Sequence, residues 1–460
     1  MKLTSSDHVL VSGWDWACAQ ALAYAADDAP VGPWIEAALP GRAAFCMRDV
    51  AHQSSGAQIL GLRRHVKNML FRFAEKIAES RDWCTYWEIN RDNLPAPVDY
   101  ISDDDFWYNL PANFDVLDCC YRQYLWTGDA DYINDPVFLN FYDRTVADYV
   151  ARWDVNGDGL LEYLPRYGRR GLGSYDEDVK NIRSGADLLA AQAAAYRAYA
   201  HIQELRDSPE TARVYRQKAA AIEAIYETQW WSESAGTFLS ILQIDGVLRA
   251  QPEYGINCFA LYFGLVQDRQ KLDRALDDLI PRFAASNVES QSYFPEVAYR
   301  YGRDEAAYAA LRHLMNPTLP RREYPEVSYS VLAAIVTGLM GVTGHADRRQ
   351  VTTLGRLPGK DDEGRTTKDE AAHWVALDGL AVGENVVAIR HDGNRQTLLH
   401  NQSGPDLLWE ARFASQVGEL RVDGSPRPAL NAVGSSGRPE SWVHVIVPAG
   451  AACTVAVLQM

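Results

Sequence analysis

Four acidic clusters recur in parts of the chain that lack helical periodicity, and several of them include Trp or Tyr. They are Arg48-Asp49, 102–107, 174–178 and 321–329. Any one of them could be a set of helix caps, because Asp, Glu and Ser are common capping residues. Their recurrence in loop after loop is harder to explain by capping. Paired carboxylates are what glycosidic bond cleavage requires, since one carboxyl protonates the leaving oxygen and the other activates water or attacks carbon.

The elements that must position these clusters are predicted to be helices up to about residue 342. Ala-rich and Leu-rich runs with 3.6-residue periodicity alternate with connections that are short, then long and rich in Gly, Pro and Trp. This alternation is typical of stacked helical hairpins. If the hairpins close into a ring, the long loops gather at one end of a barrel, where binding residues are expected.

The pattern changes from about residue 350. Short runs of alternating apolar residues are separated by turn pairs such as Asp378-Gly379, Asp392-Gly393 and Asp423-Gly424. We therefore predict two domains: a helical barrel over 1–345 and a β-sandwich over 346–460.

Composition excludes several classes of function. The 460 residues contain 45 Lys and Arg against 61 Asp and Glu, a net charge of −16, which disfavours nucleic acid as a partner. No stretch approaches 18 apolar residues and no secretory signal is evident at the start, so we expect a cytoplasmic protein with no membrane association. The seven cysteines form no CxxC pair, and we expect Cys119 and Cys120 to be buried thiols. The sequence does not determine the oligomeric state.

The order of these motifs resembles the six-hairpin (α/α)6-barrel glycosidases, which include trehalases, processing α-glucosidases, glycogen debranching glucosidases, α-L-rhamnosidases and cellobiose-type phosphorylases. The resemblance covers about residues 10–342, from the Arg-Asp pair through SDDDFWYNLPANFD and GSYDED to EYPEVSYSVLAAIVTGLMG. It implies an (α/α)6 barrel followed by a C-terminal β-sandwich. It also implies an inverting, exo-acting glycoside hydrolase that acts on a short oligosaccharide or small glycoside without a cofactor.

The resemblance also assigns roles to residues. Asp176 of GSYDED corresponds to the general acid, and Glu323 or Glu326 to the general base, with Glu289 as a further candidate for the base. The residues predicted to bind the sugar are Arg48, Asp49, Asp103, Asp104, Trp107, Trp87, Tyr175, Glu177 and Tyr324.

Other interpretations remain open at this point. Arg321 and Arg322 could bind phosphate in a glycoside phosphorylase, and a sugar lyase or epimerase would use His or Tyr as proton shuttles. Arg169 and its neighbours could recognise a uronic acid. The segment from Asp154 to Gly159 resembles the start of an EF-hand, but Pro165 stands where a bidentate Glu is required, so we expect a structural turn and no metal site.

Overall fold

A computed structural model describes residues 1–177, 179, 181–250, 254–358 and 373–458. Six helices of this part of the chain form a closed inner ring, in which each helix packs on the next and the last on the first. In ring order they are α2 (Met47–Ile59), α4 (Pro111–Thr127), α8 (Ala186–Leu205), α10 (Tyr254–Tyr262), α12 (Val288–Arg300) and α14 (Pro325–Ala333).

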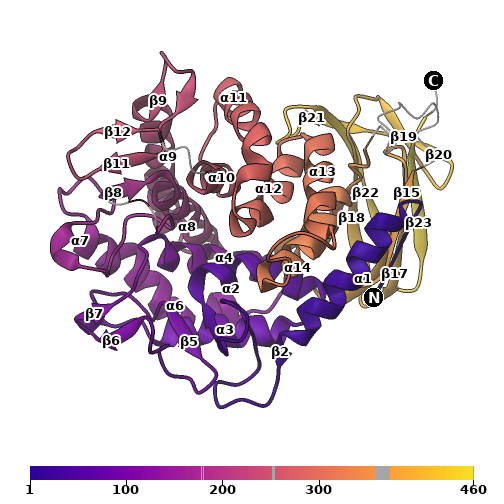
Figure 1. Cartoon of the computed structure of the whole chain (residues 1–460). Helices are drawn as coiled ribbons and strands as arrows, with labels where there is room; N and C mark the ends of the chain where they lie inside the picture. The colour runs from indigo at the N-terminus through magenta and orange to yellow at the C-terminus, as the bar shows by residue number, and fades with distance from the viewer. Residues whose placement is uncertain (178, 180, 251–253, 359–372, 459–460) are drawn as a thin grey trace.

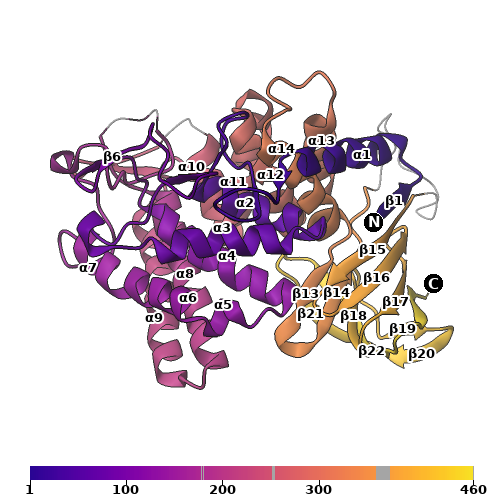
Figure 2. The same ribbon diagram turned by 90° about the horizontal axis from the view of Figure 1, so that it is seen from below.

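An outer layer of helices covers the ring (Figures 1 and 2). It consists of α1 (His8–Ala23), α3 (Arg63–Glu75), α6 (Pro136–Arg144), α9 (Pro209–Gln229), α11 (Arg269–Leu279) and α13 (Asp304–Met315). Outer and inner helices alternate along the chain, which confirms the predicted helical hairpins and the (α/α)6 barrel. All six inner helices therefore run in the same direction, and their N-terminal ends lie at one end of the barrel.

Small residues allow the inner helices to approach closely. Most of α8, including its run of alanines, is buried on all sides. Where α2 meets α14 and closes the ring, a Cβ added at Gly56 would lie 2.1 Å from the carbonyl oxygen of Tyr329. The outer helices α3 and α11 bury only one face, as their amphipathic patterns predict.

The C-terminal part forms the predicted β-sandwich, visible at the right of Figure 1. One sheet has the order β1 (Lys2–Ser5), β15 (Trp374–Val382), β16 (Asn385–Asp392), β17 (Gln396–Ser403), β23 (Ala452–Val457), β19 (Glu419–Val422) and β20 (Ser425–Pro428). The other has the order β13 (Thr343–His345), β14 (Gln350–Leu354), β18 (Leu407–Phe413), β22 (Pro439–Val447) and β21 (Leu430–Val433). Trp409 is fully buried between them, and its indole N–H donates to Thr353 Oγ1 over 2.9 Å.

Several local features can be compared with the sequence-based expectation. The sandwich takes in β1 and β13, which both lie within 1–345. Asp423-Gly424 forms the expected turn, with φ of 48° and 80°. The turn predicted at Asp378-Gly379 is wrong, since these two residues lie inside β15, where its pairing with β16 shifts register. Cys119 and Cys120 are buried as expected. No helix in the described ranges is long and apolar enough to cross a membrane.

Candidate active site

Three adjoining cavities, of about 450, 300 and 210 Å³, lie where the N-terminal ends of the inner helices meet the long loops. We call them the N-terminal cavities. Glu177 lines all three, and Arg48 and Glu289 are shared by the largest and the smallest. Four of the six inner helices contribute residues from their first turn or from the residues just before it. The arrangement confirms that the ring directs its long loops to one end.

Arg48 and Asp49 lie in the first turn of α2, next to the largest cavity. The strand before α2, β4 (Ala44–Cys46), pairs with β5 (Glu88–Asn90) and so fixes where the helix begins. Arg48 Nε lies 3.3 Å from Asp49 Oδ1, and the Cys46 thiol donates to Asp49 Oδ2 over 2.8 Å. Both Asp49 oxygens are therefore held in place at the cavity wall.

The loop that carries Asp176 is held by Asp187, a fully buried residue in the first turn of α8. Asp187 Oδ2 accepts hydrogen bonds from the Tyr175 backbone N–H over 2.6 Å and from Ser174 Oγ over 2.9 Å. Ser174 Oγ in turn accepts from the Asp176 N–H over 3.0 Å. Burial raises the pKa of Asp187 to about 6, although these hydrogen bonds oppose the shift. Asp176 is half-buried and lines the two smaller cavities.

Two glutamates face the largest cavity from the last two inner helices. Glu326, in the first turn of α14, is 4% exposed, and Glu289 lies in the first turn of α12. Each has a buried Oε2 atom with no hydrogen-bond partner. Burial, together with the charges of Asp49 and Glu289, holds the pKa of Glu326 well above its usual range.

Aromatic side chains complete the walls. Trp87, Trp107 and Tyr324 line the largest cavity, and Tyr175 lines the smallest. Trp107 is oriented by a 2.8 Å hydrogen bond from its indole N–H to Asn109 Oδ1. The Arg48 guanidinium lies 5.7 Å from the centre of the Tyr175 ring. Flat rings beside carboxylates and an arginine can hold a sugar by stacking and by hydrogen bonds to its hydroxyls.

Three predicted site residues line none of these cavities. Asp103 and Asp104 lie at the tip of the hairpin formed by β6 (Tyr100–Ser102) and β7 (Asp105–Phe106). Asp103 pairs with Arg81 over 3.0 Å, and Asp104 is 97% exposed. Glu323 is exposed, and its backbone carbonyl accepts a hydrogen bond from Tyr24. Their predicted roles stay predictions.

Sequence reasoning missed several cavity residues. Glu88 is buried at the largest cavity beside Arg42, with a closest ion-pair distance of 3.3 Å, and burial raises its pKa to about 8. Tyr293 lines the smallest cavity with a buried hydroxyl that has no hydrogen-bond partner. Glu88 directly follows Trp87, so the adjacency of an acidic and an aromatic residue could have identified it. Tyr293 lies inside a helix whose sequence pattern gives no sign of a site.

The segment that resembles an EF-hand is a turn. The Asp154 carboxylate accepts the backbone N–H groups of Gly157, Asp158 and Gly159 over 2.7, 3.1 and 2.8 Å. Over the described ranges, no group of three or more His, Cys, Asp and Glu side chains is placed to hold a metal ion.

Solved structures share this architecture. A GH78-family rhamnosidase from Bacillus sp. GL1 superposes with a TM-score of 0.58 at 12% identity over 85% of this chain. The α-L-rhamnosidase of Streptomyces avermitilis, in complex with L-rhamnose, gives 0.56 at 14% identity over 90%. A putative kojibiose phosphorylase from the human microbiome gives 0.56 at 8% identity over 97%. The chain has the fold of the six-hairpin glycosidases.

The match is one of fold and covers only part of the larger neighbours. This chain spans 40% of the Bacillus rhamnosidase, 38% of the Streptomyces enzyme and 63% of the phosphorylase. No family model matches the sequence, and no curated protein matches it either.

Proposed function

We propose that the chain is an inverting, exo-acting glycoside hydrolase for a short oligosaccharide or small glycoside. The observation that carries the proposal is that Glu326, which is buried, and Glu289, which is partly exposed, line the same cavity and each have a buried Oε2 atom without a hydrogen-bond partner. A buried carboxylate oxygen without a partner costs stability, so its retention at a cavity suggests a ligand hydroxyl or water as its partner. The rhamnosidase neighbours support a substrate of this class.

In this proposal Asp176 is the general acid and Glu326 the general base. Asp176 is carried by a loop that Asp187 holds rigidly, and the adjoining cavities lead from it to Glu326. Glu326 is preferred to Glu323 because only Glu326 faces a cavity. Arg48, Asp49 and the aromatic side chains would bind the terminal sugar. An inverting enzyme keeps its two carboxyl groups about 6.5–9.5 Å apart, which leaves room for the attacking water.

The raised pKa of Glu326 makes its role testable by pH. A general base must be ionised, so kcat/KM should rise with pH as Glu326 loses its proton. This rise should come at a higher pH than for an ordinary carboxyl group. If kcat/KM instead falls with rising pH through this transition and the fall disappears in Glu326→Gln, Glu326 is the acid and the two roles are exchanged.

The first experiment is a panel of aryl glycosides, beginning with the α-L-rhamnoside and including α-glucoside, β-glucoside, β-galactoside and β-glucuronide. On the best substrate that has a poor leaving group, Asp176→Asn should lower turnover by about 10²–10⁴-fold. A substrate with a very good leaving group should suffer less, because it needs no proton. Asp406→Asn, at an exposed side chain just before β18 of the sandwich, is the matched control. Wild-type turnover in Asp176→Asn on the poor leaving group would refute the assignment.

Proton NMR of the first product tests inversion. Release of the opposite anomer supports attack by water, and release of the substrate's own anomer refutes it.

A phosphorylase is the second candidate, because one structural neighbour is a putative kojibiose phosphorylase. Its phosphate would need cations where the base lies in a hydrolase. Arg321 is 59% exposed and pairs with Glu289, while the Arg322 guanidinium lies 3.6 Å from the centre of the Trp16 ring. Neither arginine lines the N-terminal cavities. Turnover that depends strictly on inorganic phosphate, with release of a sugar 1-phosphate, would nevertheless establish the phosphorylase.

A further inference from the structure

A separate cavity of about 340 Å³ lies at the opposite end of the inner ring, between the barrel and the sandwich. Its walls come from the C-terminal halves of α2, α4 and α12 and from the π-helical segment η5 (Ala334–Leu339), which continues α14. β13 and the residues after β14 and β21 complete them. Among the described residues, three arginines, Arg122, Arg300 and Arg356, line it with one carboxylate, Glu296. We call it the arginine cavity. It shares no lining residue with the N-terminal cavities.

Its positive charge is only partly compensated. Arg300 pairs with Glu296 over 3.0 Å, and Arg122 Nε pairs with Asp118 over 2.8 Å. Arg122 Nη2 is buried and makes no hydrogen bond, but it lies 3.9 Å from Asp115 Oδ1 in a second ion pair. Arg356 makes a 2.7 Å hydrogen bond to the Gly338 carbonyl and no ion pair with any residue that the structure describes. Burial lowers the pKa of Arg356, although the charges of Asp304 and Glu440 oppose the shift.

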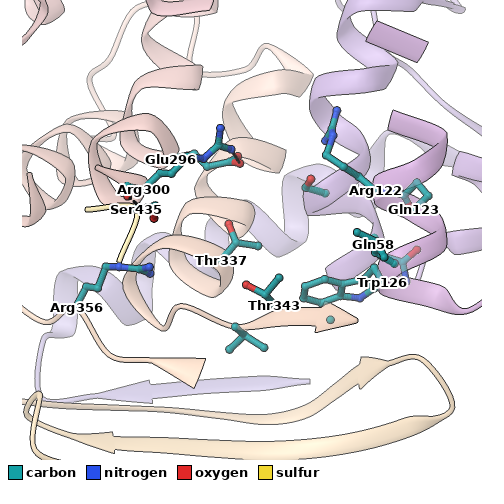
Figure 3. A pocket seen from close by; sticks show the side chains of 14 residues that line it. Gln58, Arg122, Gln123, Trp126, Glu296, Arg300, Thr337, Thr343, Arg356 and Ser435 are labelled. Carbon is teal, nitrogen blue, oxygen red and sulfur yellow. Dashed lines mark hydrogen bonds and ion pairs between the residues drawn. The ribbon is translucent and has the colours of Figure 1, made fainter. Parts of the chain in front are cut away.

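Buried amides of the same cavity also lack partners. Gln58 and Gln123 are 4% and 2% exposed, and the Oε1 atom of each has no hydrogen-bond partner. In Figure 3 both amides lie with Arg122 on one side of the cavity, and Arg300 and Arg356 lie on the other. Two unsatisfied amides facing one cavity would be costly without a ligand, since each buried unpaired polar group costs about 1–3 kcal/mol. Hydroxyl groups can satisfy them.

Trp126 provides a flat apolar wall beside these polar groups. Its indole N–H donates to the Ala381 carbonyl of β15 over 3.1 Å, which fixes the ring where it lines the cavity. An indole face suits the apolar face of a sugar ring. The volume is at the lower end of the roughly 300–1,000 Å³ typical of small-molecule sites, so it suits one ring rather than a chain of sugars.

We propose that the arginine cavity binds a monosaccharide that carries an oxyanion, either a carboxylate or a phosphate. Arg356 and Arg300 bind the oxyanion, Gln58 and Gln123 accept hydrogen bonds from the hydroxyls, and Trp126 stacks on the ring. The site is distinct from the proposed active site, and the proposal does not depend on the chain being a hydrolase.

Isothermal titration calorimetry on the full chain tests the proposal with glucose 6-phosphate and glucuronate as probes. Glucose and inorganic phosphate, titrated separately, represent the two halves of the ligand. At least one anionic sugar should bind more tightly than either half, and comparison of the two probes distinguishes phosphate from carboxylate. Binding of none of the probes at millimolar concentration, or binding of inorganic phosphate alone, would overturn the proposal.

Variants then locate the binding. Arg356→Met should weaken it by about 10–100-fold, since it removes a charged hydrogen bond. Arg421→Met, on the exposed face of β19, is the matched control and should bind like wild type. Unchanged binding in a folded Arg356→Met, or loss of binding in Arg48→Met alone, would refute the assignment and in the second case place the ligand in the N-terminal cavities.

Gln58→Leu covers the case in which Arg356→Met fails to fold. It removes a buried, unpaired amide oxygen, so the melting temperature should stay the same or rise while binding weakens. A residue with a purely structural role would shift both properties in the same direction. A lower melting temperature with unchanged binding would refute a role for Gln58 in the ligand site.

Discussion

Replacement of Asp187 by Ala tests whether the loop that carries Asp176 must be held rigid. Asp187 Oδ2 accepts two hydrogen bonds from that loop, over 2.6 and 2.9 Å, in a fully buried position. A hydrogen bond to a charged group contributes about 1.5–3 kcal/mol, so the two together contribute about 3–6 kcal/mol. Each 1.36 kcal/mol corresponds to a factor of ten in rate. If all of this energy maintains the catalytic position of the loop, turnover should fall by about 10²–10⁴-fold.

The assay is kcat/KM on the best aryl glycoside of the panel, with circular dichroism and melting temperature measured in parallel. Asp187→Asn restores an oxygen acceptor of the same shape and should lie between Asp187→Ala and wild type. Asp143→Ala is the matched control, since Asp143 is exposed on the outer helix α6 and accepts a 2.7 Å hydrogen bond from Tyr199 of α8. A folded Asp187→Ala protein with turnover within about threefold of wild type would refute the reasoning.

Three further predictions concern the ring and the cavity walls. Gly56→Ala should lower the melting temperature sharply or prevent folding, because its Cβ would lie 2.1 Å from the Tyr329 carbonyl, whereas Gly418→Ala, with no atom within 4 Å, should be nearly neutral. Glu88 has its pKa raised from 4.5 to about 8, so its contribution to stability is present below pH 4.5 and lost as pH rises through about 8. Glu88→Gln should therefore reduce the fall in melting temperature between about pH 5 and 9. A pH dependence of the melting temperature equal to that of wild type would contradict this. Tyr293→Phe removes an unpaired buried hydroxyl, so stability should hold while KM rises by about tenfold; a drop in melting temperature with unchanged KM would argue for a structural role.

The barrel could be predicted because its signal is local. Each outer helix carries an apolar stripe and each inner helix carries small or apolar residues on most faces, so 3.6-residue periodicity reports both. The alternation of short and long connections then indicates which end of the ring collects the loops. The pairing of β1 with β15 could not be predicted, because it joins Lys2–Ser5 to residues some 370 positions later in the chain. Nothing in four residues specifies so distant a partner.

Some residues of the candidate site could likewise be predicted from the sequence, and others could not. The family resemblance pointed to Arg48 and Asp49, and to Glu326 with Glu323 as the alternative. The structure places Arg48, Asp49 and Glu326 in the first turn of an inner helix, whereas the sequence analysis assigned their segments to loops. Asp103 belongs to a hairpin that is tied to Arg81, a residue outside that segment, so the segment alone does not reveal its position. Adjacency of acids and aromatic residues in sequence thus indicates a loop of the right composition, but not where that loop docks.

The parallel inner helices could by themselves explain why acids gather at one end of the barrel and arginines at the other. A helix N-terminus favours carboxylates and a C-terminus favours cations, by about 0.3–1 kcal/mol each. That effect requires only charge near the helix ends, and it is satisfied by exposed or paired side chains such as Asp118 with Arg122. It does not explain buried polar atoms that have no partner, and these occur at both ends: Glu326 and Glu289 at the N-terminal cavities, Gln58 and Gln123 at the arginine cavity. Unpaired burial costs more than the dipole returns, so these atoms support the ligands that we propose at the two ends.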